Sequence, residues 1–160
     1  MRKAYLASPL GFSHELSGYL ERVKARLREV GLEVTDPWEQ SYAAELEAAR
    51  HVTGHDARHR MLRDLAGVIG SANERLIREA DILFAVLDGA EVDSGTASEV
   101  GFAAGLGKVC YGLRTDWRNS GDLPGLPLNL QVLHFIEWSG GSLFRRIEDI
   151  MIEQTSGDSL

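Results

Sequence analysis

The chain has 160 residues, of which 44% are hydrophobic and 26% charged, and its 24 acidic and 17 basic side chains give a net charge of −7. A globular chain of this length buries roughly 70% of its unfolded surface, so it can form a single core without disulfides or a structural metal. The acidic balance, with a pI of about 5.2, excludes proteins that need a basic surface to bind nucleic acid polymers or anionic membranes.

The beginning of the chain and its single cysteine bear on where the protein works. Pro9 interrupts the first apolar stretch before the hydrophobic core of a signal peptide could form. No apolar run approaches the ~20 residues that cross a bilayer, and Cys110 cannot pair within the chain, which fits a reducing compartment. We therefore expect a cytoplasmic protein with one domain over residues 1–154 and a polar tail at residues 155–160.

The first part of the chain alternates between short apolar runs and an amphipathic stretch. Residues 4–7 have the length of a strand, and apolar side chains recur at three- and four-residue steps over residues 13–30, which predicts a helix. Gly31 stands where a helix C-cap belongs, and residues 32–35 predict a second strand. Together these elements form one β-α-β unit.

The middle of the chain is less regular. Residues 39–60 are rich in Ala, Glu and His, which predicts one or two short helices and a mobile loop. Residues 60–80 predict a helix that is broken near residues 67–71, because glycine weakens helices. Residues 82–87 are apolar on both faces and predict a third strand in the middle of a parallel sheet.

The last part continues the alternation. Residues 95–107 predict a helix of small residues, residues 109–113 a fourth strand, residues 132–136 a fifth strand and residues 143–152 a closing helix. This pattern is typical of an α/β fold with a doubly wound, flavodoxin-like sheet of about five parallel strands and flanking helices. Ligands of such folds bind at the carboxyl ends of the strands, so the function should lie in the loops there.

The loop after the first strand is a candidate anion site. Residues 8–13 precede the predicted helix, whose first backbone amides can bind an anion. The loop lacks the glycine spacing of a dinucleotide site and the Gly-Lys-Ser/Thr ending of a P-loop, so it supports neither NAD nor a nucleoside triphosphate. Alternatively, Ser13 caps the helix.

Residues 93–101, between the third strand and the next helix, have two interpretations. Thr96 and Glu99 have the T-x-x-E spacing of a capping box, in which each side chain bonds the backbone amide of the other residue. Alternatively, Glu99 is a carboxylate near Asp93, about one helical turn past the strand, among small residues that leave room for a ligand. Such a carboxylate can attack a sugar carbon, as in retaining glycosidases. The pattern alone does not decide between them.

Along nearly its whole length the chain resembles the nucleoside 2-deoxyribosyltransferase family. Four segments carry the resemblance, in the family's order and spacing: residues 5–10, Asn73 with Ile77 and Ala80-Asp81, the block D-x-G-T-A-x-E-x-G at residues 93–101, and the late loops at residues 115–119 and 126–130. Residues 40–70 match poorly, because they are longer and more charged than the family pattern.

The resemblance implies a two-step exchange of bases on 2′-deoxyribonucleosides. Glu99 attacks C1′ and releases the base, which leaves a deoxyribosyl-glutamate ester, and a second base then takes the sugar. Tyr5 is implied to aim the Glu99 carboxylate by a hydrogen bond, unless it is a core tyrosine. No metal or cofactor is required, and the expected partners are small deoxynucleosides and free nucleobases.

The resemblance also implies residues that bind the sugar. Asp93 matches the family residue that binds the sugar hydroxyls, and a carboxylate there suits a free 5′-hydroxyl and repels a 5′-phosphate. The alternative is a turn residue beside Gly95. Ser8, Pro9 and Phe12 of the first loop, and Gly95, are expected to bind the same substrate.

The base is expected to lie between Asn73 and an aromatic wall. Asn73 stands where some family members have Asp, a group that helps to protonate or position the leaving base. Asn can only hydrogen-bond, which favours purines over pyrimidines. Pro37 and Trp38 follow the second strand, and an indole face stacks on a heterocycle. A surface Asn and a core Trp are the alternatives.

Asn129 matches a family residue that reaches the active site of a neighbouring subunit and contacts the 5′ end of the sugar. The resemblance therefore implies a homo-oligomer whose subunits share active sites. Alternatively, the segment around Asn129 merely leads into the predicted fifth strand.

Three histidines fall at four-residue steps in the poorly matching segment. His51, His55 and His59 would share one face of a continuous helix, with Asp56 among them. Because Gly54 weakens such a helix and the family needs no ion, we expect a solvated or base-contacting face in preference to a metal site.

Two other functions are compatible with these residues. An N-glycosidase for deoxynucleosides or their 5′-monophosphates shares the first step, because only the access of water or of a base to the ester separates hydrolysis from transfer. A nucleotide-sensing module of a different class would bind on the same sheet without turnover.

Overall fold

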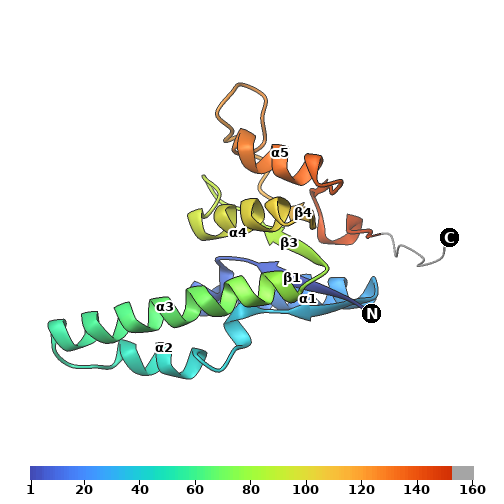
Figure 1. Ribbon diagram of the computed structural model, residues 1–160. Helices are drawn as coiled ribbons and strands as arrows, with labels where there is room; N and C mark the ends of the chain where they lie inside the picture. The colour runs from blue at the N-terminus through green and yellow to red at the C-terminus, as the bar shows by residue number, and fades with distance from the viewer. Residues whose placement is uncertain (153–160) are drawn as a thin grey trace.

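A five-stranded parallel sheet forms the centre of the computed structural model, which describes residues 1–152 (Figure 1). Its strands are β1 (Arg2–Ala7), β2 (Leu32–Thr35), β3 (Ile82–Val86), β4 (Val109–Leu113) and β5 (Leu143–Phe144). They lie in the order β2-β1-β3-β4-β5, and all neighbouring pairs are parallel. This order confirms the α/β class and the flavodoxin-like, doubly wound sheet that the alternating pattern predicts.

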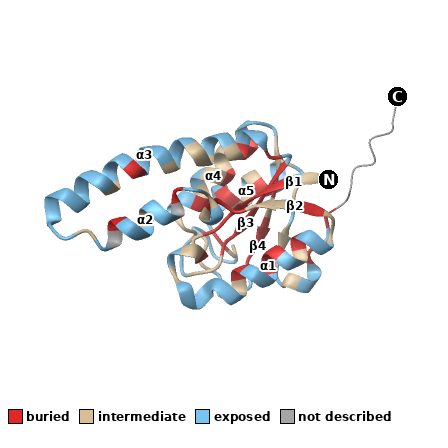
Figure 2. Cartoon of the chain, turned by 90° about the horizontal axis from the view of Figure 1, so that it is seen from below, coloured by how far each residue is buried: buried red, intermediate tan, exposed pale blue. Residues whose placement is uncertain are grey.

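Helices cover both faces of the sheet, because its central strands are apolar on both sides (Figure 2). One face packs against α1 (Ser17–Glu29) and against Ile150 and Ile152 near the end of the described chain. The opposite face packs against α3 (His55–Glu79), α4 (Ser94–Gly105) and α5 (Leu130–Trp138). All five residues of β3 are buried, as the sequence predicts for a middle strand.

The helix predicted at residues 13–30 begins only at Ser17. Two 3₁₀ turns, η1 (Leu10–Phe12) and η2 (His14–Leu16), occupy the segment before it. Ser13 has an extended backbone, with φ −129° and ψ 118°, and its side chain caps no helix. Gly31 follows the helix with a φ of 88°, a value that favours glycine, so its predicted place at the C-terminus is confirmed.

The segment between β2 and β3 forms a helical hairpin that projects from the sheet (Figure 1). After the 3₁₀ turn η3 (Pro37–Glu39), α2 (Ala43–Arg50) packs against α3. The predicted break near residues 67–71 is wrong, because α3 is continuous. Its glycines lie in open space, and the buried side chains of Leu65 and Ile77 hold the helix on the protein.

The structure corrects both predictions at the end of the chain. Residues 132–136 belong to α5 and not to a strand: Asn129 caps this helix, and Val132 and Ile136, four residues apart, are the buried pair on one helical face. Residues 143–152 do not form a closing helix, because Leu143 pairs with Gly112 in β4, and only the 3₁₀ turn η4 (Ile147–Asp149) follows.

Within residues 1–152, none of the helices combines the length and the apolar composition that crossing a bilayer requires.

Cys110 in β4 is fully buried, and burial raises the pKa of its thiol to about 11. The thiol is therefore a protonated, small apolar group of the core. The predicted tail at residues 155–160 lies outside the described residues.

Candidate functional site

The loops that follow β1 and β3 border a cavity of about 230 Å³. This position, beyond the carboxyl ends of the central strands, is where a doubly wound sheet binds its ligands. The cavity brings together residues from four separate parts of the sequence. Those that the sequence singles out are Ser8, Phe12, Pro37, Trp38, Asn73, Asp93, Gly95 and Glu99.

Glu99 lies in α4 and points toward the sheet. Its Oε1 accepts hydrogen bonds from the Tyr5 hydroxyl at 2.6 Å and from the Asn73 Nδ2 at 3.2 Å. The helix is capped by Asp93, whose Oδ2 accepts from the Thr96 amide at 2.8 Å, so the T-x-x-E spacing does not form a capping box. Within residues 1–152, the hydrogen bonds of Glu99 all end on Oε1, which leaves Oε2 available to a ligand.

The surroundings of Glu99 alter its protonation and that of Tyr5. Burial raises the pKa of the Glu99 carboxyl; the hydrogen bonds from Tyr5 and Asn73 oppose this shift, and the charge of Asp93 adds to it. Burial, followed by the Glu99 charge, also raises the pKa of Tyr5 far above its ordinary range. Tyr5 therefore keeps its proton and remains a hydrogen-bond donor to Glu99.

Asn73 is held between two side chains. Its Nδ2 donates to Glu99, and its Oδ1 accepts from the Tyr42 hydroxyl at 3.0 Å. Tyr42 immediately precedes α2 and is only 7% exposed. The helical hairpin and β1 thus meet at one carboxylate, although residues 5, 42, 73 and 99 are far apart in the sequence.

Trp38 forms one wall of the cavity. Its indole Nε1 donates to the backbone carbonyl of Ser8 at 2.9 Å, and Phe12 packs edge-on against the indole with ring centroids 4.5 Å apart. Asp36 caps η3 by accepting from the Trp38 amide at 2.9 Å, which fixes the backbone that carries the indole. Such an apolar, aromatic wall suits a flat ring.

Asp93 has a structural role besides lining the cavity. Its Oδ2 accepts from both the amide and the hydroxyl of Thr96, at 2.8 and 3.1 Å. A Cβ on Gly95 would lie 3.1 Å from the same oxygen, so Gly95 leaves room for the carboxylate. Asp93 therefore both caps α4 and borders the cavity, and its binding of the sugar hydroxyls stays a prediction.

Three of the predicted residues do not line this cavity: Tyr5, which is fully buried and reaches the site only through its bond to Glu99, Pro9 and Asn129. Pro9 immediately precedes η1, and its carbonyl accepts from the Phe12 amide at 3.1 Å. Asn129 is exposed and caps α5, with Oδ1 accepting from the amides of residues 131 and 132. It lines a separate hollow together with Ser120 and Asp122.

Four residues of the cavity lining are not singled out by the sequence. Tyr42, Leu46 and Ile69 belong to the segment that resembles the family poorly, and no motif there marks them. Thr96 lies inside the recognised block, but the pattern assigns it only to a helix cap. The spacing of apolar residues in α2 and α3 predicts which helical faces are buried. It does not show whether a buried residue lines a cavity or belongs to the core.

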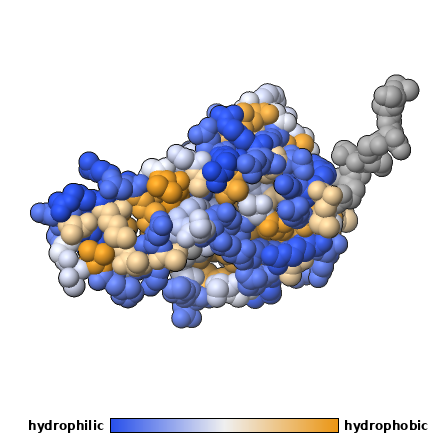
Figure 3. Space-filling model, turned by 60° about the horizontal axis from the view of Figure 1, so that its bottom comes forward, coloured by the Kyte–Doolittle hydropathy of each residue, from blue (hydrophilic) through white to orange (hydrophobic). Residues whose placement is uncertain are grey.

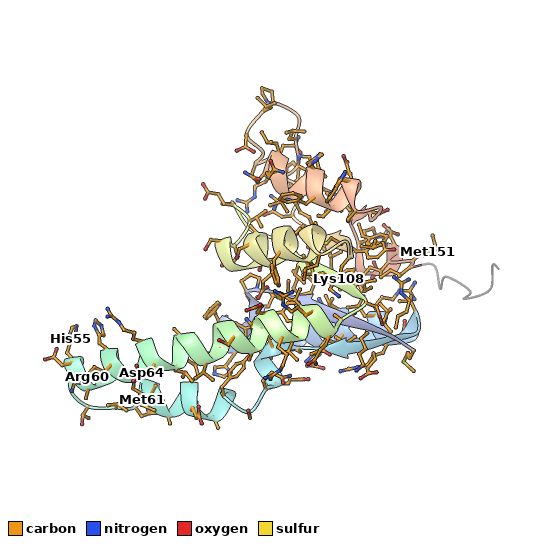
Figure 4. All side chains as sticks on the ribbon, viewed as in Figure 1. His55, Arg60, Met61, Asp64, Lys108 and Met151 are labelled. Atoms are coloured by element: carbon orange, nitrogen blue, oxygen red, sulfur yellow. The ribbon has the colours of Figure 1, made fainter. Side chains whose placement is uncertain are left out.

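The three histidines lie away from the cavity. His51 follows α2, and the rings of His55 and His59 are 4.0 Å apart at the beginning of α3, so the three histidines do not share one helix, as expected from the position of Gly54. Figure 4 shows His55 at the far end of α3, and Figure 3 shows this projecting end with mixed polar and apolar surface. Among residues 1–152, no group of three His, Cys, Asp or Glu side chains is placed to hold a metal ion.

The sequence matches the model of a known protein family. The family model described as nucleoside 2-deoxyribosyltransferase matches residues 4–131. This range includes every residue of the cavity lining. No curated protein matches the sequence.

Several solved structures are similar to this chain. A conserved protein from Enterococcus faecalis V583 shares 24% identity over 93% of this chain and 94% of its own, with a TM-score of 0.65. The 2-deoxyribosyltransferase from Bacillus psychrosaccharolyticus shares 21% identity over 96% and 93%, with a TM-score of 0.59. A CMP N-glycosidase from Clostridium botulinum shares 15% identity over 92% and 93%, with a TM-score of 0.47. The first two similarities show a common fold.

Proposed function

The chain belongs to the nucleoside 2-deoxyribosyltransferase family, a class of glycosyl-transferring enzymes that act on small nucleosides, and we propose that it exchanges the bases of 2′-deoxyribonucleosides through a covalent intermediate on Glu99. The observation that supports this proposal is the placement of one carboxylate. Glu99 is turned away from its own helix terminus, held through Oε1 by Tyr5 and Asn73, and borders a cavity with an aromatic wall.

In the first step, an oxygen of Glu99 forms a bond to C1′ of the sugar. Because Oε1 is occupied by two donors, Oε2 is the attacking oxygen. The electron pair of the N-glycosidic bond leaves with the base, which takes a proton from water. The carboxylate stabilises the positive charge that develops on the sugar, and the product is a deoxyribosyl ester of Glu99.

In the second step, a ring nitrogen of another base attacks C1′ of the ester. The electron pair of the C1′–O bond returns to Glu99, and the incoming base loses its proton to solvent. Each step inverts the configuration at C1′, so the exchange retains it overall. The buried Tyr5 hydroxyl remains a donor throughout and keeps the carboxylate in place.

The lining of the cavity favours particular substrates. Trp38 and Phe12 provide the flat apolar surface on which a base stacks. Asp93 borders the same cavity, and its charge favours a free 5′-hydroxyl over a 5′-phosphate. Asn73 cannot act as an acid, so the leaving base takes its proton from water and can receive only a hydrogen bond from Asn73, which favours purines.

The proposal includes a homo-oligomer with shared active sites. Asn129 is exposed and lies outside the cavity of its own chain. A contact between Asn129 and the 5′ end of the sugar would therefore be made in the cavity of a second copy of the chain.

The decisive experiment is intact-mass spectrometry after mixing the protein with 2′-deoxyadenosine alone. We expect a mass increase of one deoxyribosyl group, located by proteolysis on the peptide that contains Glu99. Addition of free guanine should remove the adduct and yield 2′-deoxyguanosine. Free deoxyribose without a new nucleoside would indicate a hydrolase, and tight binding without any adduct or product would indicate a sensing module. Either result would overturn the proposed transfer.

Gly11→Ala should impair substrate binding, because a Cβ at this position would lie 2.2 Å from the Trp38 indole. The indole must move away from the cavity wall, and we expect the KM for the deoxynucleoside to rise about tenfold, the order of effect of losing one stacking contact. Steady-state kinetics would measure it. Gly18→Ala in α1 is the control, because nothing lies within 4 Å of its Cβ position. Equal KM values for the two variants would refute a role of the Trp38 wall in binding.

A further inference from the structure

Tyr42 lines the same cavity as the proposed nucleophile and belongs to the segment of the chain that the family pattern describes least well. It is 7% exposed, and its hydroxyl is 3.0 Å from Asn73 Oδ1. Asn73 in turn places Nδ2 at 3.2 Å from Glu99 Oε1. A single line of hydrogen bonds therefore joins the beginning of α2, the middle of α3 and the carboxylate on α4.

The direction of these bonds follows from chemistry. An ionised carboxylate accepts hydrogen bonds and cannot donate them, so the amide group of Asn73 must turn its NH₂ toward Glu99. The amide oxygen then faces Tyr42, and the phenol must be the donor. Without the Tyr42 hydroxyl, the amide oxygen would lose its donor, and only the carboxylate would oppose a flip of the amide. The flipped orientation would place a carbonyl oxygen against the carboxylate.

We infer that Tyr42 is a positioning residue, which holds the Asn73 amide in the orientation that donates to Glu99 and so keeps this carboxylate ionised and aimed for attack. This inference rests on the proposed function of Glu99. It assigns a role to a side chain that makes no bond to Glu99 itself. It also explains why a tyrosine hydroxyl is buried at the cavity edge, where it needs a partner.

The charges around Glu99 define what a titration should show. Tyr5 and Asn73 donate to it from β1 and α3, and Asp93 opposes its ionisation from the loop before α4. Tyr42 stays protonated, because burial and the charges of Glu99 and Asp36 raise the pKa of its phenol. Loss of the hydrogen bond from Asn73 therefore raises the pKa of Glu99. When the solution is acidified, Glu99 would then take up its proton at a higher pH than in the wild-type protein.

The test is Tyr42→Phe, which removes only the hydroxyl. The pKa of Glu99 is measured by carbon NMR on protein labelled at the glutamate carboxyl carbon, with the Glu99 signal assigned by its loss in Glu99→Gln. We expect the variant to raise this pKa by about 0.5 to 1. We also expect the acid limb of kcat to move by the same amount, with kcat lowered about threefold to tenfold and KM changed less than about twofold.

Two controls separate positioning from packing. Tyr19→Phe also removes a tyrosine hydroxyl that donates to a carboxylate, since the Tyr19 hydroxyl lies 2.7 Å from Asp88 Oδ2. Both residues lie outside the cavity, so this variant should leave the titration of Glu99 unchanged. In an Asn73→Ala background, adding Tyr42→Phe should cause no further shift, because the amide that transmits the effect is gone. An unchanged pKa of Glu99 in Tyr42→Phe, or a full shift without Asn73, would overturn the inference.

The titration needs no turnover, so it separates the two hypotheses. A wild-type protein that forms no adduct with a deoxynucleoside would refute the proposed function, and the NMR shift would still decide whether Tyr42 sets the ionisation of Glu99. A wild-type protein that forms the adduct, with a Tyr42→Phe titration equal to its own, would refute the inference about Tyr42 alone.

Discussion

Glu99→Gln should abolish the covalent adduct and lower the rate of base exchange by about 10⁴-fold or more, the order of loss seen when a nucleophile is removed. A neutral carboxamide does not stabilise the positive charge on the sugar, and it forms no ester. The side chain keeps its shape, and its amide oxygen still accepts from Tyr5, so the site should stay assembled. The change also removes a partly buried charge and should not lower the stability of the fold.

The measurements are the initial rate of exchange between 2′-deoxyadenosine and guanine, and the affinity for the deoxynucleoside by calorimetry. We expect affinity within about fivefold of wild type, because the loss is in transition-state stabilisation and not in ground-state binding. Glu91→Gln is the control: it makes the same change of charge at an exposed position outside the cavity and should retain activity within about twofold. An exchange rate for Glu99→Gln within tenfold of wild type would mean that the nucleophile is another group.

The strands of the first half of the sheet follow directly from the sequence. Residues 82–87 are continuously apolar, and a strand covered on both faces is the structure that buries such a run. The same physical reason accounts for the first strand, whose residues 4–7 are all buried. The alternation of strands with helices predicts a parallel, doubly wound sheet, and with it the edge at which the site lies.

The error at the end of the chain has a specific cause. Residues 132–136 form a short apolar run, and a run of this length fits a buried strand and one side of a buried helix equally well. In the structure this segment is a helix, and Asn129 stabilises its first turn as the N-cap. From the sequence alone, the same asparagine is equally compatible with a ligand-binding residue. The true edge strand, β5, has only two residues and gives no periodic signal.

The motifs of the site could be predicted from the sequence, but the hydrogen bonds between their side chains could not. Glu99 is ambiguous in sequence, because T-x-x-E describes both a capping box and this site, and only the three-dimensional position of Tyr5 resolves the choice. Tyr42 could not be found, because its contact with Asn73 depends on how α2 packs against α3. Such tertiary contacts leave no local pattern.

The largest effect on stability is expected at Lys24 of α1, whose ammonium group is buried among three carboxylates. Nζ lies 3.1 Å from Asp36 Oδ2 and 2.7 Å from Glu39 Oε1, and the side chains of Lys24 and Asp36 are only 2% and 1% exposed. Glu21 completes the group at 2.5 Å, but it and Glu39 are more than half exposed and screened by water. The pair of Lys24 and Asp36 therefore carries most of the energy.

Lys24→Met keeps the apolar stem of the side chain and removes the charge. Asp36 would then be a buried carboxylate without its cation, and breaking such a pair costs about 3 to 5 kcal/mol of the free energy of unfolding. We expect a loss of about 3 kcal/mol, at the low end of this range, because two of the partners are exposed. Urea denaturation followed by circular dichroism would measure it. Arg75→Met, which breaks the exposed pair with Glu79, should cost less than about 1 kcal/mol.

A double variant tests the cause of this loss. Lys24→Met combined with Asp36→Asn leaves no unpaired charge and should recover more than half of the lost stability, because the penalty comes from the buried carboxylate and not from the missing attraction. The Asn side chain can still accept from the Trp38 amide and cap η3, so the cavity wall should survive in the double variant. In Lys24→Met alone, water must reach Asp36, and the backbone that carries Trp38 loosens. If the single and double variants are equally unstable, Lys24 acts through packing of its stem, and the buried charge pair does not support the wall.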